Sequence, residues 1–453
     1  MDNVARVKML NKIKSDTKAT KGYMRVISFL DSGSFCEIDG LAKSSDGCAE
    51  AVAGYGTTDG CPVCVFSQNS DVSGGAMSKA QASKLQKLYR LAIKKGVPVV
   101  GFFDSKGARL NEGADMLKAY GEILLDANNL SGVVPQISVI LGPCTGTSAM
   151  VAAGADIIIM SENGELTINT NGEGGKPESA EELGISHISA ENEQQAIDYA
   201  RRLISILPSN NLESVPNLEP VQPKLQTSAL NAGSDIRQII SSVCDGDSFL
   251  EFGKKFASNV ITGFGQIGGF TSGIISLSGM LNADCCSKAA RFMRYCDSFS
   301  IPAVTLVDAE GFSTLREASK LSSAYSEATT VKITAVTGSA CGAVYIAVAG
   351  RGANSDYTIS WPDAVISPLA PETAAIFLWN DKLKNSENPV EDRKKLIAEY
   401  KDTEASPLKA AADGLIEDVV TPEDTRKSLI SALDMLSGKR VSTLPKKHSD
   451  IQL

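Results

Sequence analysis

The chain has 453 residues, a mass of 47.7 kDa and a formal net charge of −9, with 53 acidic against 44 basic side chains. Its hydrophobic content of 43% and charged content of 21% are those of a folded globular protein, which excludes the disordered and fibrous classes. The acidic balance disfavours a nucleic-acid partner, and neither a membrane span of ~18 apolar residues nor a signal peptide is recognisable, so we expect a cytoplasmic protein.

The N-terminal stretch is rich in basic side chains and predicts a surface helix suited to docking a partner. Its cations are Arg6, Lys8, Lys12, Lys14, Lys18, Lys21 and Arg25. A hairpin follows at about residues 52–68, where two apolar runs flank the turn at Asp59 and Gly60.

Helices alternate with continuous apolar runs through the rest of the first half, a pattern typical of an α/β sheet covered on both faces. The predicted elements are, in order, a lysine-bearing helix at 78–95, a strand at 97–103, a loop at 104–112, a helix at 113–130, a strand at 136–141, a glycine turn at 142–146 and a small-residue helix at 147–155. Residues 208–232 then carry four prolines among Asn, Ser and Gln, which predicts a linker.

The second half repeats the first. The matched positions are Asp31 with Asp245, Gly54 with Gly263, Asp104 with Asp308 and Gly142 with Gly338, at offsets of 214, 209, 204 and 196 residues. Four matches in the same order, with a steady drift that loop shortening produces, indicate an internal duplication. We therefore predict two domains of one kind, at residues 1–225 and 226–453.

Two motifs associated with cofactors lack the surroundings that they need. Cys61 and Cys64 have the CxxC spacing of half a zinc knuckle, but no second CxxC follows, so buried thiols on a strand are expected. Residues 263–268 fit GxGxxG literally, yet they lie between two predicted strands rather than before a helix, which predicts a hairpin. The ten cysteines are too sparse for a disulfide scaffold, and reduced thiols are expected.

Each half contains a glycine turn between a strand and a helix, at residues 142–147 and 338–344. Such a turn leaves backbone N–H groups free at the start of the helix, where the helix dipole adds positive potential. The device binds an anion, or a carbonyl that is becoming one. Tight packing of a helix on a sheet also favours Gly and Ala, but the matched occurrence in both halves favours a function.

A second backbone donor is expected from another loop in each half, at residues 107–108 and 311–312. The preceding strand is predicted to end at Asp104 in the first half and at Asp308 in the second. Either aspartate is a candidate base, although aspartates at the ends of strands more often cap turns.

Histidine is scarce, which restricts the chemistry. His187 lies in a polar, glutamate-rich stretch and His448 near the C-terminus, and neither stands beside a nucleophile or a group of metal ligands. Histidine-based catalysis and histidine-ligated metals are therefore disfavoured, and we expect no metal in this chain. Two domains with backbone oxyanion holes and few acid–base groups suit a reaction through two enolate-like species that meet in one cleft.

Several segments resemble the carboxyltransferase subunits of biotin-dependent acyl-CoA carboxylases and decarboxylases. These segments are residues 104–113, 131–138, 141–144, 325–329, 360–364, 413–422 and 445–448. The resemblance covers nearly the whole chain in the right order. It is nearer to the propionyl-CoA carboxylase beta and methylmalonyl-CoA decarboxylase alpha subunits than to the zinc-ribbon acetyl-CoA subunit, because only one CxxC is present.

The resemblance implies an α/β fold of two tandem crotonase-like (ClpP/crotonase) domains, assembled as a hexamer of dimers with each active site between the N-half of one chain and the C-half of another. The N-terminal domain would bind acyl-CoA, and the C-terminal domain would bind biotin on a separate carrier protein. Carboxybiotin would release CO₂, and the biotin enolate would remove the α-proton of the thioester. Biotin is then the base, which suits a histidine-poor chain.

The resemblance also assigns roles to individual residues. The expected catalytic donors are Gly146 and Thr147 for the thioester oxygen and Gly342, Ala343 and Val344 for the ureido oxygen. The expected substrate-binding residues are Gly107, Ala108, Arg109, Lys79 and Ile346, and Gly311 and Phe312 are expected to form the biotin-side loop. Further candidate cations for the CoA phosphates are Lys84, Lys87 and Lys106.

The chain departs from the family pattern at its glycine motifs. Gly146 and Thr147 stand for a Gly-Gly pair, residues 342–344 read Gly-Ala-Val instead of Gly-Gly-Ala, and the loop after residue 312 is shorter. These changes leave the acyl substrate open between propionyl- or methylmalonyl-CoA and acetyl- or malonyl-CoA.

Neither a biotin-attachment Met-Lys-Met nor an ATP-binding module is recognisable. The expected partners are therefore a biotin carboxyl carrier protein and either a biotin carboxylase or a membrane decarboxylase subunit. The direction stays open between carboxylation and sodium-exporting decarboxylation. Two other classes compete. One is a crotonase-type hydratase or thioesterase, which would need carboxylate or hydroxyl groups near one hole and no second half, and the other is a catalytically weak scaffold subunit.

Overall fold

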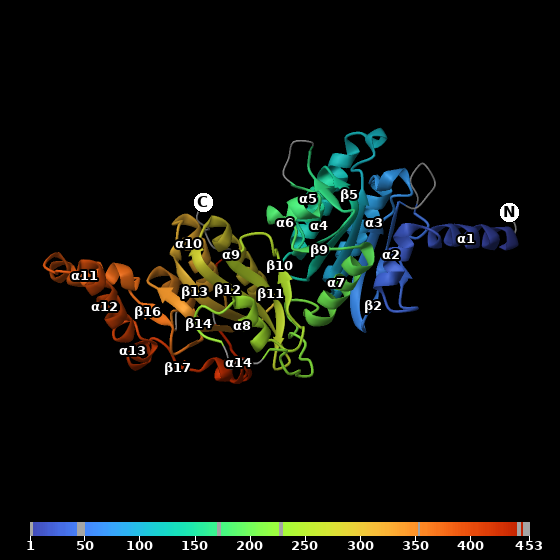
Figure 1. The fold of residues 1–453 in the computed structure, drawn as a ribbon. Helices are drawn as coiled ribbons and strands as arrows, with labels where there is room; N and C mark the ends of the chain where they lie inside the picture. The colour runs from blue at the N-terminus through green and yellow to red at the C-terminus, as the bar shows by residue number, and fades with distance from the viewer. Residues whose placement is uncertain are drawn as a thin grey trace. The chain divides into compact units, whose positions relative to one another are not determined.

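The computed structural model describes residues 3–42, 50–169, 174–225, 230–351, 354–441 and 445–446. The chain divides into two compact units (Figure 1), the first of Met1–Pro216 with Gly253–Phe256 and the second of Asn217–Phe252 with Ala257–Leu453. Among the helices of these described ranges, none is long and apolar enough to cross a membrane.

The first unit is built on a sheet whose main path runs β1-β2-β3-β4-β5-β6-β9. The strands are β1 Cys36–Glu37, β2 Ala51–Thr58, β3 Cys61–Gln68, β4 Val99–Ser105, β5 Gln136–Thr145, β6 Ile157–Ser161 and β9 Ile188–Ala190, with β7 Glu165–Thr167 beside β5 and β8 Gly174–Gly175 beside β7. The first three strands pair antiparallel, and the path from β3 to β9 is parallel. Strands β4 and β6 are buried along their whole length, as parallel strands covered by helices are.

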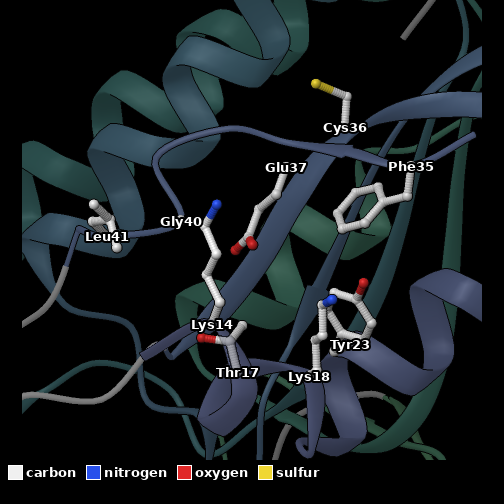
Figure 2. A pocket seen from close by; sticks show the side chains of 9 residues that line it. All are labelled: Lys14, Thr17, Lys18, Tyr23, Phe35, Cys36, Glu37, Gly40 and Leu41. Atoms are coloured by element: carbon white, nitrogen blue, oxygen red, sulfur yellow. The ribbon is translucent and has the colours of Figure 1, made fainter. Parts of the chain in front are cut away.

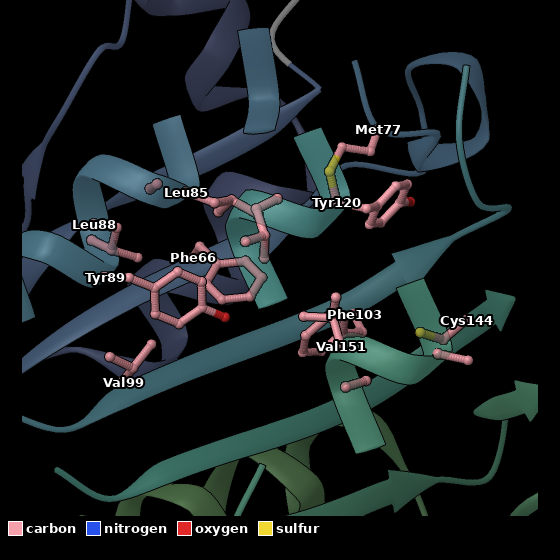
Figure 3. Close-up of a cluster of buried hydrophobic side chains, with 14 of the residues drawn as sticks. Phe66, Met77, Leu85, Leu88, Tyr89, Val99, Phe103, Tyr120, Cys144 and Val151 are labelled. Atoms are coloured by element: carbon pink, nitrogen blue, oxygen red, sulfur yellow. The ribbon is translucent and has the colours of Figure 1, made fainter. Parts of the chain in front are cut away.

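Helices pack on this sheet and close its core. They are α2 Lys21–Phe29, α3 Lys79–Lys95, α4 Asp115–Leu130, α5 Thr147–Ala153, α6 Pro177–Glu182 and α7 Glu193–Ile206, with short turns η1 Ser73–Gly75 and η2 Leu110–Glu112. In the first helix, α1 Asn3–Lys18, only Thr17 is buried. Figure 3 shows Leu85, Leu88 and Tyr89 of α3 against Phe66 and Phe103 of the sheet. The spacing of the three α3 residues places them on one helix face.

The second unit repeats this plan along the path β10-β11-β12-β13-β14-β15-β17. Its strands are β10 Leu250–Phe252, β11 Val260–Ile267, β12 Phe270–Leu281, β13 Ala303–Phe312, β14 Lys332–Cys341, β15 Tyr357–Ser360 and β17 Asp418–Val419, with β16 Val365–Ser367 beside β14. Its helices are α8 Ile236–Val243, α9 Ala283–Ser298, α10 Arg316–Glu327, η3 Tyr345–Ala349, α11 Pro371–Lys384, α12 Pro389–Asp402, α13 Pro407–Ala412 and α14 Pro422–Leu436.

In each unit an aspartate binds the turn of a hairpin and forms an ion pair with an arginine on a helix. Asp31 accepts hydrogen bonds from two backbone N–H groups at the β2–β3 turn and pairs with Arg201 on α7. Asp245 accepts two from the β11–β12 turn and pairs with Arg426 on α14. The sequence match at these aspartates therefore reflects a repeated hydrogen-bond arrangement, which supports the duplication.

Most expected elements lie where the sequence predicted them, and three need correction. The turns predicted at 142–146 and 338–344 begin later than expected, because β5 continues to Thr145 and β14 to Cys341. The GxGxxG segment belongs to the β11–β12 hairpin, and Cys61 and Cys64 lie on β3, as expected. The strand predicted to end at Asp308 continues to Phe312, because β12 offers it partners that far. The basic N-terminal stretch forms two helices, and Arg25 on α2 is buried rather than on the surface.

Candidate active site

The first glycine turn joins β5 to α5. Gly146 adopts φ 64° and ψ −138°, a conformation that excludes most side chains, and its N–H donates to the carbonyl of Thr167 at 2.9 Å. The next two N–H groups, those of Thr147 and Ser148, have no acceptor among the described residues. The free donors of this turn are therefore the N–H groups of the two residues after Gly146, and not that of Gly146 itself.

The second turn joins β14 to η3 in the same way. Gly342 has φ 51°, and its N–H donates to the carbonyl of Ser367 at 2.9 Å. Within the described part of the chain, the N–H groups of Ala343 and Val344 find no acceptor. Ile346 in η3 is 64% exposed. The two units thus carry equivalent turns, each with two unpaired backbone donors.

A second loop lies beside the first turn. Ser105 pairs with Cys144 across β4 and β5, so the chain leaves both strands at the same edge of the sheet. The backbone of Met77 holds the loop after β4 through two hydrogen bonds. Its N–H donates to the Gly107 carbonyl at 2.8 Å, and its carbonyl accepts from the Arg109 N–H at 3.0 Å. The N–H of the residue between them, Ala108, has no acceptor in the described ranges.

The equivalent segment of the second unit is not a loop. Gly311 and Phe312 lie in β13 and pair with Met280 and Leu281 of β12. The expectation of a biotin-side loop at these residues is corrected, because the ladder with β12 keeps them extended. Both residues are half-buried and lie at the end of their strand.

Two expected phosphate-binding cations are buried. Lys84 has a side chain 3% exposed, and its Nζ donates to the carbonyl of Ala51 at 2.9 Å. Burial lowers the pKa of Lys84. Arg109 is 5% exposed and forms an ion pair with Glu50 at 2.5 Å. Both side chains hold neighbouring segments together, so neither is directed at an outside phosphate.

The remaining candidate cations are exposed. Lys79 pairs with Asp115 on the surface, and Lys87 pairs with Asp39 at 2.6 Å. Lys106, in the loop after β4, is exposed and has no ion-pair partner within the described ranges. It is therefore the cation of the expected set that is available to a ligand beside the first turn.

Among the described residues of the first unit, the structure has two cavities that the sequence did not predict. One, of about 430 Å³ (Figure 2), is lined at one side by Lys14 and Lys18 of α1 and by the aromatic rings of Tyr23 and Phe35. The other, also about 430 Å³, runs along α5 and β7 and is mostly apolar. Its lining includes Ala149, Met150, Ala153, Leu166, Ile168 and Ile185.

The side chains around the first turn are not poised for acid–base or nucleophilic chemistry. Burial raises the pKa of the Cys144 thiol to about 12, so this cysteine stays protonated. His187 has a structural contact, since its Nδ1 accepts the N–H of Ile158 at 2.8 Å. His448 lies outside the described residues. In the described ranges, no three His, Cys, Asp or Glu side chains come together as a metal site.

Comparison with known proteins places relatives along the whole chain. The model of the carboxyl transferase domain matches residues 23–451. The carboxyltransferase subunit of propionyl-CoA carboxylase from Haloferax mediterranei is 35% identical over 479 residues, covering 95% of this chain and 92% of that protein. Methylmalonyl-CoA decarboxylase subunit alpha from Propionigenium modestum is 34% identical over 477 residues, covering 95% and 92%.

A solved structure matches the fold equally well. Transcarboxylase 12S, described as a hexamer assembly with methylmalonyl-CoA and methylmalonic acid bound, has a TM-score of 0.92 at 32% identity and covers 100% of this chain and 99% of its own. This agreement confirms the α/β fold class of two tandem crotonase-like domains.

Proposed function

We propose that this chain, which belongs to the carboxyl transferase family, moves a carboxyl group between biotin and a short-chain acyl-CoA. The enzyme class is that of biotin-dependent acyl-CoA carboxyltransferases. The observation that carries the proposal is similarity of 34–35% over 95% of the chain to enzymes of propionyl-CoA and methylmalonyl-CoA, combined with two equivalent turns of free backbone donors.

The first turn would stabilise the thioester oxygen. In this proposal Gly146 shapes the turn, and the N–H groups of Thr147 and Ala108 hold the oxygen as negative charge develops on it. Backbone donors fixed before the reaction stabilise such charge without reorganisation. In this proposal the apolar cavity along α5 binds the thioester's hydrocarbon parts, and the exposed Lys106 binds a CoA phosphate.

The second turn would hold biotin. The unpaired N–H groups of Ala343 and Val344 fit an acceptor such as the ureido oxygen of biotin. Bound biotin supplies the carboxyl group and the base, so the chain itself needs to bind, orient and stabilise charge. Ile346, exposed two residues after Val344, is the proposed determinant of the acyl pocket.

The complex is proposed from the same relationships. Biotin would arrive on a separate carrier protein, and a biotin carboxylase or a membrane decarboxylase subunit would complete the assembly. Transcarboxylase 12S is described as a hexamer, and we propose a hexamer for this chain too. Within it, the proposed arrangement has dimers in which the N-half of one chain faces the C-half of another. A carboxylase and a decarboxylase subunit are almost equally similar to this chain, so the sodium-exporting decarboxylase is the second candidate function.

A direct assay tests the function. We expect the purified subunit to decarboxylate methylmalonyl-CoA or malonyl-CoA when free biotin is added. The reaction is measured as the CO₂ released. The comparison of the two thioesters also gives the acyl preference. Demonstrated CoA binding without turnover of any short acyl-CoA would instead support the scaffold subunit.

Substitution of Lys106 and of Lys84, one at a time, distinguishes a role in phosphate binding from a role in packing. We expect Lys106→Met to raise the KM for acyl-CoA about 10- to 100-fold, because a charge-assisted contact contributes about 1.5–3 kcal/mol. Lys84→Met should leave that KM unchanged and lower the melting temperature, since it removes a buried donor to Ala51. The matched control substrate is an acyl-pantetheine, which lacks the nucleotide phosphates, and Lys106→Met must leave its KM unchanged.

A further inference from the structure

The parallel ladder of each unit contains the same irregularity just before its glycine turn. Between Phe103 and Ser105, β4 advances two residues while its partner β5 advances four. Between Val307 and Ala309, β13 advances two residues while β14 advances four. Each unit therefore has a bulge of two extra residues on the strand that leads into the turn.

An aspartate fills each bulge. A Cβ placed on Gly142 of β5 would lie 2.3 Å from Oδ1 of Asp104, and one on Gly338 of β14 would lie 2.0 Å from Oδ1 of Asp308. The carboxylate thus occupies the space that a side chain on the bulged strand would take. Asp308 Oδ1 also accepts the N–H of Ser339, a bulge residue, at 2.8 Å.

The two carboxylates differ in their charge environment. Oδ2 of Asp104 is 2.9 Å from the Arg25 guanidinium and 2.6 Å from Ser70 Oγ. Asp308 has no ion-pair partner within the described ranges. At the position matched to Arg25 by the 214-residue offset, the second unit has the buried apolar residue Ile239.

We infer that Asp104 and Asp308 are positioning residues, each of which holds its bulge open and so fixes the direction of the glycine turn four residues after Gly142 or Gly338. Bulges beside active sites commonly re-aim a strand end in this way. The inference rests on the proposed function, under which Asp104 orients the thioester-side donors and Asp308 the biotin-side donors. It also explains the glycines at 142 and 338, which make room for the carboxylates.

Alanine variants test the two sides separately. Because a misplacement of about 1 Å can cost about 10²-fold, we expect Asp308→Ala to lower kcat about 10- to 100-fold and to raise the KM for free biotin, with the Kd for acyl-CoA unchanged. Asp104→Ala should lower kcat by a similar factor and raise the Kd for acyl-CoA. It should leave the KM for biotin unchanged. The matched controls are Asp156→Ala and Asp356→Ala, whose carboxylates hold the first residues of β5 and β14, far from the turns.

Conservative variants supply a second, asymmetric readout. Asp308→Asn keeps the Oδ1 acceptor for Ser339 and should recover most of the lost rate. Asp104→Asn should not, because a neutral amide leaves the buried Arg25 guanidinium short of a counter-charge. Because the loss of the Arg25 pair also lowers stability, the rates of the two asparagine variants are compared at a temperature at which their melting curves show both to be folded.

Amide hydrogen exchange separates the inference from the proposed function. We expect faster exchange at residues 338–347 in Asp308→Ala and at residues 141–149 in Asp104→Ala, each without change at the other turn. This result would stand even if the wild-type chain showed no carboxyl transfer, which would contradict the proposed function alone. Unchanged exchange at both turns, or equal kinetic effects of the bulge and control aspartates, would overturn the inference.

Discussion

We expect Gly146→Val to lower turnover about 10²–10³-fold while the subunit keeps its fold. Gly146 has φ 64° and ψ −138°, where a β-branched residue is strained, so the backbone must move. Nothing lies within 4 Å of a Cβ at this position, so the strain comes from the backbone and not from a clash. The movement displaces the Thr147 N–H, which is proposed to hold the thioester oxygen.

The measurement compares kcat with the melting temperature and the oligomer size. A matched control is Gly60→Val at the β2–β3 turn, since Gly60 also has positive φ, 80°, and open space around its Cβ. The control should lose similar stability, about 1–3 kcal/mol, and keep its turnover. Full activity of Gly146→Val would remove the first turn from the mechanism.

The second large effect is on stability. We expect Arg25→Met to destabilise the first unit by about 3–5 kcal/mol, because it leaves Asp104 as a buried charge without its partner. The Arg25 side chain is 6% exposed and the Asp104 side chain 10% exposed. Burial by itself would lower the pKa of Arg25, but the hydrogen bonds and charges of Glu193 and Asp104 raise it above its ordinary value.

Urea titration and calorimetry measure the change in free energy of unfolding. Lys87→Met is the matched control, since the Lys87–Asp39 pair is exposed, with side chains 59% and 29% accessible. Its removal should cost at most about 1 kcal/mol. Adding Asp104→Asn to Arg25→Met should restore part of the lost stability. Equal costs for the buried and the exposed pair would contradict this account.

The sequence was informative where the signal is local. Apolar runs, turn residues and repeated glycines predicted the strands, the hairpins and the two glycine turns. The period of α3 also contained a signal for Lys84, which shares a helix face with the buried Leu88, four residues later. Residues three and four apart on a helix lie on one face, so its burial followed from the same pattern that predicted the core.

Contacts between segments distant in sequence were not predictable. The pairing of Arg109 with Glu50 and of Arg25 with Asp104 depends on which segments the fold brings together. The bulges depend on the register between neighbouring strands, which no local pattern specifies. One indirect signal existed: Asp104 and Asp308 recur at matched positions, each before a recurring glycine.

Transfer of an isotopic label tests the central claim most directly. Methylmalonyl-CoA labelled with ¹³C in its free carboxyl group is incubated with the subunit and free biotin, and the products are followed by ¹³C NMR. We predict that the label appears on a biotin nitrogen and in CO₂, only when biotin is present, with the thioester intact. Release of free CoA would contradict carboxyl transfer and favour a crotonase-type thioesterase, and loss of the label as CO₂ without biotin would contradict carboxyl transfer to biotin.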